Sequence, residues 1–524
     1  MMGGRRRRCF GFRRLRREGR GLVAALGLGF ACPVPVSAKT TRVRTEGQLS
    51  GLLSTVQPGD VIEVAPGTYD TDIYLGRPGL DGMPVIIRGI VGADGTRPIL
   101  RGGDNTVTLE SSHVVFESLE VTGGTQRCIY VIGNDIILRD VVVHDCPGHG
   151  IHAADEATGT LVIDRSEVYR SGGGEYDHQI YVTTDQETFP GAVFRLQHSY
   201  VHDATGGNNI KSRAERNEIY FNWIEGARYH ELELIGPDVD RPPPGIREDS
   251  DVVGNVLRKT NGDSHGVRLG GDATMDTNGR YRLVHNTFWM RNGAMSPVRL
   301  FDGVESLELY NNVFFVDGGQ PTTLLRTARV KWARGAPLIL GSHNFIPPGS
   351  TAVPPALTDT IASATGPGFV SLTALDLRPR LDSPLVDAAT PDMATHPEAP
   401  FPSGLAVTSH QPRRWGLRAP RLRAARGSRP DVGAFETGPM LEASETAVDG
   451  ALHLPRGATS PPPLPPAGRC GCRVVGQRPP ASALPPAALW GCGLVVALLG
   501  RRRRRRWHRH QSPLLQRTTS KPSA

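Results

Sequence analysis

The sequence predicts an all-β chain folded as a right-handed parallel β-helix, a solenoid of short stacked strands. Two observations carry this prediction. A triplet of one polar, one variable and one apolar residue recurs every ~22–33 residues between residues 101 and 346, a period typical of solenoids. Each triplet lies in a short alternating run rich in Val, Ile, Tyr and Phe, and such strands bury an apolar face only by stacking, at about 4.8 Å per coil. In chain order the triplets are Leu119–Val121, Val141–Val143, Ser166–Val168, Ser199–Val201, Asn222–Ile224, Asn255–Leu257, Asn286–Phe288, Asn312–Phe314 and Asn344–Ile346, the first two with an apolar residue at the polar position.

The last five triplets all begin with Asn. Asn side chains stacked at one turn can hydrogen-bond along the stack and to the turn backbone, which satisfies buried polar groups in successive coils. Helical repeats would instead need apolar residues three and four apart, and propeller blades would need about 40–45 residues each. The pattern therefore favours a β-helix with an Asn ladder.

The two ends of the predicted β-helix, which spans residues 39–346, differ from its middle. Thr45 and Gln48 form a capping box before an apolar run that begins at Leu49, so a short N-terminal helix is expected to cover the first coil. Covering that open edge prevents aggregation. Residues 347–436 lack the regular repeat and are predicted to form an irregular C-terminal cap.

Three segments resemble known β-helix proteins. Pro58 to Tyr69 is similar to the first coil of the pectate-lyase-like superfamily, and Ser383 to Asp387 and Pro430 to Glu436 resemble the closing motifs of bacterial surface β-helix proteins. The resemblance covers residues 45–436 and implies the right-handed coil. It implies no single activity, because this fold occurs in lyases, hydrolases, epimerases and adhesins.

The formal charge of +8 comes from the two ends of the chain. Residues 1–38 hold nine Arg against one acidic residue, and residues 501–524 hold nine basic residues and no acidic one. The part between them has more acidic than basic residues. This distribution argues against nucleic acid as the partner and assigns the basic clusters to targeting.

The N-terminus has the layout of a secretory signal peptide over residues 1–38. A basic region precedes an apolar run from Gly21 to Ala31, and Val36 to Ala38 provide a small-residue cleavage site. The apolar run is shorter than the roughly 18–20 residues that span a bilayer. A lipoprotein signal at Cys32 is less favoured, because Gly29 stands where a Leu is expected.

The β-helix and its cap, residues 39–436, form the body of the protein. Beyond the body, Pro-rich composition predicts an extended linker, and no core is expected in the two disordered tails. In order, these C-terminal segments are a Pro-rich linker (437–469), a sorting-type segment (470–506) and a basic tail (507–524).

The sorting-type segment resembles the MYXO-CTERM signal of myxobacterial surface proteins. Cys470 and Cys472 precede a short apolar run (487–500) and six consecutive Arg from Arg501. The resemblance implies cleavage and attachment to the cell envelope through a modified Cys, so the protein is expected to be secreted and attached to the cell surface or outer membrane. The Arg cluster would stay cytoplasmic. An ordinary membrane anchor is the alternative, for which the apolar run is short.

Only two of the seven cysteines, Cys128 and Cys146, lie in the body. In an oxidising compartment they can form a disulfide. Two buried free thiols are the equally favoured alternative. The spacing of 18 residues, slightly less than one coil, leaves both open.

A second strand of each coil points one row of side chains outward. Aligned by the first inward apolar residue of each strand, the next residue faces outward because side chains alternate. Aromatic residues cover sugar rings, Arg pairs with carboxylates, and the coil spacing of about 4.8 Å is close to one sugar unit. The row is therefore expected to face solvent and bind acidic polysaccharide. Its residues are Tyr130, His152, Tyr181, Lys211, Glu233, Arg268 and Arg299, which follow Ile129, Ile151, Ile180, Ile210, Leu232, Val267 and Val298.

The superfamily resemblance implies roles for this row and its neighbours. In its uronic-acid lyases a basic residue removes the proton next to a carboxylate that Ca²⁺ or another cation has neutralised. A solvated strand face that blocks edge aggregation is the alternative. The implied roles are Lys211 as base, Arg213, Arg268 and Arg299 as carboxylate-neutralising or binding groups, Tyr181 or His152 as acid, Tyr130 as a substrate-binding residue, and Glu231 and Glu233 as Ca²⁺ ligands.

A glycoside hydrolase is disfavoured. That chemistry needs two carboxylates across the bond. Cys146 to Gly150 and Asn209 to Lys211 resemble polygalacturonase motifs only superficially, because the paired-aspartate motif is missing.

A column of histidines, one per coil, lies two residues before the inward position. It comprises His149, His178, His230 and His265, with Asn208 interrupting it. One His per coil makes a row and not a tetrahedral cluster, so a turn-capping ladder is favoured over a metal site.

These features predict an exported, monomeric cell-surface β-helix protein that binds acidic polysaccharide and cleaves it by β-elimination, with Ca²⁺ as the one cofactor considered. The alternative is a non-catalytic adhesin or matrix protein that uses the same face for recognition only. A loop over residues 236–249 that walls the face around Lys211 would favour the enzyme.

Overall fold

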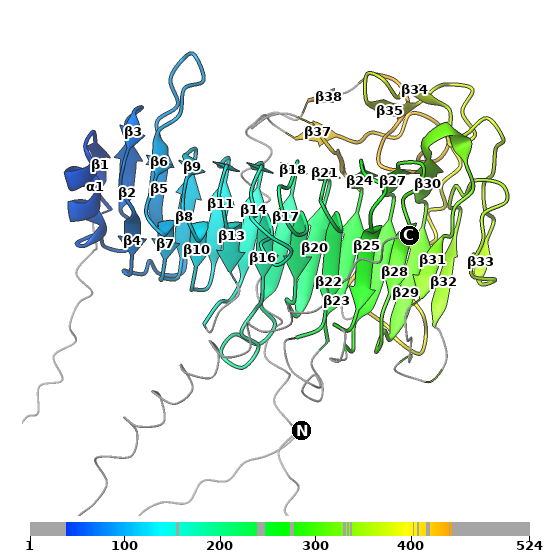
Figure 1. Ribbon diagram of the computed structural model, residues 1–524, viewed down its shortest axis with the longest axis horizontal. Coiled ribbons are helices and arrows are strands. Elements are labelled where there is room, and N and C mark those ends of the chain that lie inside the picture. Colours follow the sequence, from blue (N-terminus) through cyan, green and yellow to red (C-terminus); the bar gives the residue numbers. More distant parts are fainter. Residues whose placement is uncertain are drawn as a thin grey trace, which may run out of the picture. The chain divides into compact units, whose positions relative to one another are not determined.

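The computed structural model confirms the right-handed parallel β-helix (Figure 1). Ten coils contribute one strand to each of three parallel sheets, which we call A, B and C in chain order, and sheet A has three further strands at its ends, so that the sheets have 13, 10 and 10 strands. The structure describes residues 38–442 except 154–156, 238–246, 273–276, 328–331, 333–334, 336–337, 402, 406–407, 415–419 and 440.

The strands are short, and their bounds show the repeat. Sheet A consists of β1 Thr40–Val43, β2 Val61–Val64, β5 Val85–Gly89, β8 Val114–Glu117, β11 Ile136–Arg139, β14 Leu161–Asp164, β17 Val193–Gln197, β20 Arg216–Tyr220, β23 Asp249–Val253, β26 Arg280–Val284, β29 Ser306–Tyr310, β32 Ile339–Ser342 and β33 Leu357–Thr358. Sheet B consists of β3 Thr68–Tyr69, β6 Ile99–Arg101, β9 Glu120–Thr122, β12 Val142–His144, β15 Glu167–Tyr169, β18 Tyr200–His202, β21 Trp223–Glu225, β24 Val256–Lys259, β27 Thr287–Met290 and β30 Val313–Val316. Sheet C consists of β4 Ile73–Leu75, β7 Asn105–Leu109, β10 Arg127–Val131, β13 His149–Ala153, β16 Ile180–Val182, β19 Ile210–Ser212, β22 Leu232–Ile235, β25 His265–Gly270, β28 Ser296–Leu300 and β31 Leu325–Thr327.

The core is a stack of apolar side chains inside the coil. Inward residues of the three sheets form one continuous buried cluster that runs from Val43 to Leu357. The predicted inward column of sheet C, from Ile129 to Val298, is completely buried and belongs to this cluster. Stacking therefore supplies the apolar contacts that a single strand of three to five residues cannot make.

The five triplet asparagines form the predicted ladder. The backbone N–H of each one donates to the side-chain oxygen of the next, as from Asn255 to Asn286 (3.0 Å) and from Asn286 to Asn312 (3.0 Å). The Asn286 amide also donates to the Val252 carbonyl at 2.8 Å. All five side chains are fully buried, so the ladder satisfies polar groups that water cannot reach.

The predicted capping helix is α1 Glu46–Leu53, at the start of the coil (Figure 1). The Thr45 hydroxyl accepts from the Gln48 N–H at 3.3 Å, and the Gln48 side chain accepts from the Arg44 N–H at 2.8 Å. Leu49 and Leu53 are buried against the first coils. The capping box thus fixes the start of the helix, as expected.

The segment predicted as a cap returns along the outer face of sheet B. Figure 1 shows part of it, with β37, running past the strands of that sheet. Val432 and Phe435 join an apolar cluster with Trp223 and Phe315, and Arg414 donates to Glu225 at 3.0 Å. The segment therefore packs on the C-terminal half of sheet B, from β18 to β30. It contains β34 Phe369–Ser371, β35 Asp376–Pro379, β36 His410–Gln411 and β37 Arg421–Leu422, while β38 Leu441–Glu442 follows it in the predicted linker and a 3-10 helix, η1 Asp317–Gly319, precedes it.

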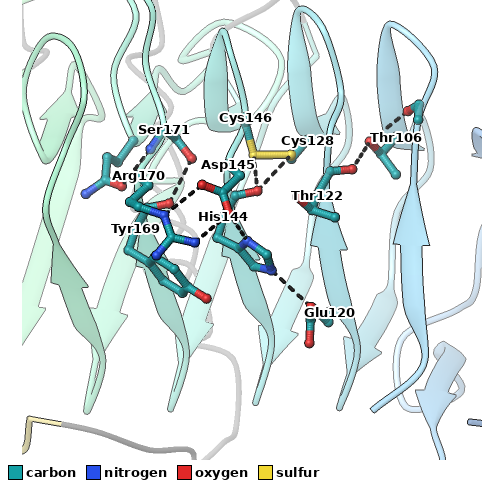
Figure 2. Close-up of a disulfide and its surroundings, with 12 residues drawn as sticks. Thr106, Glu120, Thr122, Cys128, His144, Asp145, Cys146, Tyr169, Arg170 and Ser171 are labelled. Carbon is teal, nitrogen blue, oxygen red and sulfur yellow. Dashed lines mark hydrogen bonds and ion pairs between the residues drawn. A yellow bond between two sulfur atoms is a disulfide. The ribbon is translucent and has the colours of Figure 1, made fainter. Parts of the chain in front are cut away.

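Cys128 and Cys146 form a disulfide at the corner between sheets B and C, which decides between the two alternatives (Figure 2). Their Cα atoms are 5.8 Å apart, and both residues are buried. The bond joins neighbouring coils beside His144, whose ring nitrogens contact Glu120 and Asp145 at 3.0 and 2.7 Å.

The disulfide is expected to stabilise the coil. Replacing Cys128 and Cys146 together with Ser lowers the free energy of unfolding by about 3 kcal/mol, the value for a closed loop of about this length. Urea unfolding of the full chain, with and without reductant, measures this loss of unfolding free energy. The reductant lowers the wild-type midpoint to that of the double variant and leaves the variant unchanged. Equal midpoints under oxidising conditions would contradict the stabilising role.

Glu248 is a buried carboxylate whose contacts are hydrogen bonds from the Thr277 hydroxyl and from the Asn278 N–H at 3.2 Å. Burial raises the pKa of Glu248 to about 7. Because the folded pKa lies above the unfolded value, the protonated form contributes stability below about pH 4.5 that is lost as the pH rises through about 7.

We expect the wild type to lose about 3 kcal/mol of unfolding free energy between pH 4.5 and 8.5 relative to Glu248→Gln, whose amide does not titrate. Urea unfolding of both proteins across this range gives the difference directly. A constant difference would contradict the raised pKa.

The predicted signal peptide (1–38), all but its last residue, and the C-terminal segments beyond residue 442 lie outside the described residues. Within the described part, no helix has the length and apolarity needed to cross a membrane.

Candidate functional site

The outward residues of sheet C form one row in register. Tyr130 pairs with His152, His152 with Tyr181, and Tyr181 with Lys211. Lys211 then pairs with Glu233, and the register continues through Arg268 to Arg299. The alternation of strand side chains therefore confirms the predicted alignment.

The row is longer than the sequence pattern indicated. Tyr74 and Thr108 precede Tyr130, and Arg326 follows Arg299. An alternating signal was present in Ile73–Leu75 and Val107–Leu109, whereas β31 reads Leu-Arg-Thr and lacks the second apolar residue. We call the complete set the outer row: Tyr74, Thr108, Tyr130, His152, Tyr181, Lys211, Glu233, Arg268, Arg299 and Arg326.

The expectation that the whole row faces solvent is wrong for three members. His152, Glu233 and Arg268 are 6, 4 and 7% exposed. Neighbouring rings cover His152, and ion pairs between adjacent coils cover the other two. In contrast, Tyr74 is 57% exposed, and Arg326 is also exposed.

Glu233 is the centre of the charged part of the row. Its carboxylate accepts from Arg268 and, at 2.6 Å, from Asn208, and it lies 3.9 Å from the Lys211 amine. Burial by itself raises the pKa of Glu233, but Arg268 and Lys211 outweigh burial and bring the pKa down to about 2. Glu233 is therefore ionised, and it holds the two cations on either side of it.

Arg213 belongs to the same network. It is 3% exposed and donates to Asp272 at 2.5 Å, to the Gly236 carbonyl at 2.8 Å and to the Tyr181 hydroxyl at 3.1 Å. Arg268 donates to the other oxygen of Asp272 at 3.0 Å. Asp272, which the sequence pattern did not indicate, thus ties Arg213 to Arg268. Arg268 precedes Asp272 by four residues in the same coil, whereas Arg213 comes from another coil and is 59 residues away in the sequence.

Glu231 lies apart from this network, at a corner inside the coil. It is fully buried, accepts from Asn209 at 2.6 Å and lies 3.6 Å from the Lys259 amine. Since hydrogen-bond donors and cations already contact both Glu231 and Glu233, the pair does not fit a Ca²⁺ site. We therefore derive no step through Ca²⁺.

His152 sits among other rings. Its Nδ1 accepts from Arg127 at 2.6 Å, and its ring stacks on that of His149 at 4.6 Å. Burial, together with His149 and Arg127, lowers the pKa of His152 to about 2. The ring is therefore neutral at neutral pH.

The histidine column is the predicted turn-capping ladder. His149 Nδ1 accepts from the His178 N–H, and His178 Nδ1 accepts from the Asn208 N–H, both at 3.0 Å. Asn208 continues the ladder, because its side-chain oxygen accepts from the His230 N–H at 2.9 Å. Among the described residues, no group of three or more His, Cys, Asp or Glu side chains is placed to hold a metal ion.

Most of the loop predicted to wall the face around Lys211, residues 238–246, lies outside the described residues. Its first residue, Gly236, accepts from Arg213 through its carbonyl.

No family model matches the chain, and no curated protein matches it. Among solved structures, it is similar to an alginate lyase from Paenibacillus sp. str. FPU-7, with 16% identity over 57% of this chain and 97% of that chain and a TM-score of 0.38. It is also similar to the pectate lyase Pel9A, with 16% identity over 77% and 98% and a TM-score of 0.41. A third similar protein is the GH136 lacto-N-biosidase from Eubacterium ramulus, with 10% identity over 57% and 68% and a TM-score of 0.30. These identities and TM-scores are too low to assign roles to residues of this chain. The function of the site is therefore argued from the chain's own side chains.

Proposed function

We propose that the outer row binds acidic polysaccharide along the coil axis. The observation that carries this proposal is the register of sheet C, which lines up the exposed Tyr74 and the half-buried Tyr130 at one end and Arg299 and Arg326 at the other. Steps of about 4.8 Å between coils match successive sugar units. Tyrosine faces cover sugar rings, and guanidinium groups pair with uronate carboxylates.

We further propose that the bound chain is cleaved at Lys211 by β-elimination. As a neutral amine, Lys211 takes the proton from the ring carbon next to a uronate carboxylate. The electron pair left on that carbon forms a double bond to its neighbour as the glycosidic C–O bond at the neighbour breaks. The departing oxygen takes a proton, so that the products are an unsaturated uronate and a new chain end.

Tyr181 is the better proton donor of the two proposed acids. It is the neighbour of Lys211 in the row, and the Lys211 amine lies 5.2 Å from its ring centre. Arg213 donates to the Tyr181 hydroxyl and would stabilise the phenolate that forms, so Arg213 acts as a positioning residue. His152 is neutral at neutral pH and is held by Arg127, which leaves no imidazolium proton to give.

Binding without cleavage is the second candidate function, and one observation favours it. Lys211 lies 3.9 Å from Glu233, so its side chain already has an ion-pair partner within the row. In that case the same row serves recognition only, as in an adhesin or matrix protein.

One experiment separates the two functions. The full chain is incubated with polygalacturonate, alginate and a neutral glucan, while ultraviolet absorption of the conjugated double bond and binding to the immobilised polymers are both recorded. Cleavage of a uronate predicts rising absorption, whereas recognition alone predicts retention without absorption. Retention on the neutral glucan alone, or on none of the polymers, would contradict acidic-polysaccharide binding.

We also propose that the protein is exported and held at the cell surface. The signal layout of residues 1–38 and the sorting-type segment 470–506 support this, as does the disulfide, which persists in oxidising compartments. Digestion of intact cells by added protease is expected to remove the body. Complete protection of the body would contradict surface attachment.

A further inference from the structure

The cations of the outer row fall into two groups. Lys211 and Arg268 each lie against Glu233, and Arg213, beside the row, is paired with Asp272. Among the residues that the structure describes, no carboxylate is paired with Arg299 or Arg326. The row therefore ends in two cations whose charges no carboxylate of the described residues balances.

The two end cations are adjacent. Arg299 and Arg326 are register partners on neighbouring strands, which are about 4.8 Å apart. The Nε atom of Arg299 is buried, and within the described part of the chain it has no hydrogen-bond partner. Burial lowers the pKa of Arg299, and repulsion from Arg268 and Arg326 lowers it further. An oxyanion between the two guanidinium groups would remove this repulsion and supply the missing acceptors.

Phe301 holds the Arg299 guanidinium in position. The Arg268 guanidinium lies 4.1 Å from the centre of the Phe301 ring, and that of Arg299 lies 4.5 Å from it. A guanidinium already held against a ring loses less freedom when it binds a ligand. Arg299 is thus preorganised, whereas Arg326 is exposed and accessible to a ligand.

We propose that Arg299 and Arg326 form a carboxylate-binding subsite, three to four coils beyond Lys211, that anchors the far part of a bound uronate chain. The inference rests on the proposed function and adds a chain-length requirement to it. Three and four steps of about 4.8 Å place the subsite roughly 14–19 Å from Lys211 along the row. A chain centred at Lys211 must therefore extend about three or four sugar units in that direction to reach it.

The test compares the full-length wild type with Arg299→Gln/Arg326→Gln. A matched control, Arg291→Gln/Arg429→Gln, removes two exposed Arg side chains elsewhere. Calorimetric titration with uronate oligomers of two to eight units is expected to show a wild-type affinity that rises steeply once the oligomer reaches the subsite. The double variant is expected to bind the long oligomers roughly tenfold or more weakly and the short ones equally well, and the control is expected to follow the wild type. Because Arg326 is exposed, the single variant Arg326→Gln is expected to fold like the wild type. Its affinity for the long oligomers is expected to fall, as that of the double variant does.

A second titration, with inorganic sulfate alone, separates the subsite from the proposed function. Sulfate is expected to raise the melting temperature of the wild type and of the control more than that of the double variant. If no oligomer binds but this sulfate difference is present, the anion subsite is supported and the polysaccharide proposal fails. If long oligomers bind the wild type and the double variant equally, the subsite is overturned and the proposed function stands. An equal sulfate response in all proteins, without oligomer binding, overturns both.

Discussion

Replacing Lys211 with Met is expected to abolish uronate cleavage while leaving polysaccharide binding nearly intact. A positioned general base contributes roughly 10²–10⁴-fold to a rate, so formation of the unsaturated product should fall by about that factor. Met keeps the length of the side chain against Tyr181 and removes only the amine. Initial rates from ultraviolet absorption, measured with retention on the same immobilised polymer, give the two effects separately.

The control for this prediction is Lys39→Met, which removes an exposed lysine far from sheet C and is expected to cleave like the wild type. Equal cleavage by the wild type and Lys211→Met would rule out Lys211 as the base. A wild type that binds polymer and forms no unsaturated product would instead establish the recognition-only function.

Replacing Asn286 with Ala is expected to cost about 3–5 kcal/mol of unfolding free energy, the largest effect on stability that we predict. Asn286 accepts from the backbone and side chain of Asn255 and donates to Val252 and Asn312. Truncation leaves the Asn255 N–H and the Val252 carbonyl without these partners in a buried corner. Each such unsatisfied group costs roughly 1–3 kcal/mol.

Urea unfolding of the full chain measures this loss. Asn292→Ala removes the same side chain from an exposed turn and is expected to change stability by less than about 0.5 kcal/mol. A loss at Asn286 no larger than that at Asn292 would show that the ladder is not needed for stability.

Local sequence patterns determined the coil and the order of the outer row. The recurring Asn and the alternation of apolar residues predict both, because stacking repeats the environment of each position from one coil to the next. The same regularity predicted the histidine ladder, and the local capping box at Thr45 and Gln48 predicted the start of α1. It also aligned Lys211 with Tyr181 and Glu233, although their sequence separations differ from coil to coil.

Contacts between side chains of different coils, and the packing of the returning segment, were decided only by the tertiary structure. Asp272 meets Arg213 from another coil, and residues of the segment 361–436 pack on the outer face of sheet B, far from it in the sequence. The choice between a disulfide and two thiols at Cys128 depended on the distance between neighbouring coils.

The sequence by itself therefore determined that the chain is a β-helix and which residues share a row. Only the tertiary structure decided which of those residues are buried and paired, as Glu233 is, and which have no paired carboxylate among the described residues, as is the case for Arg299. The physical reason is that a strand's direction and period follow from local alternation, whereas burial and charge balance depend on side chains contributed by distant coils.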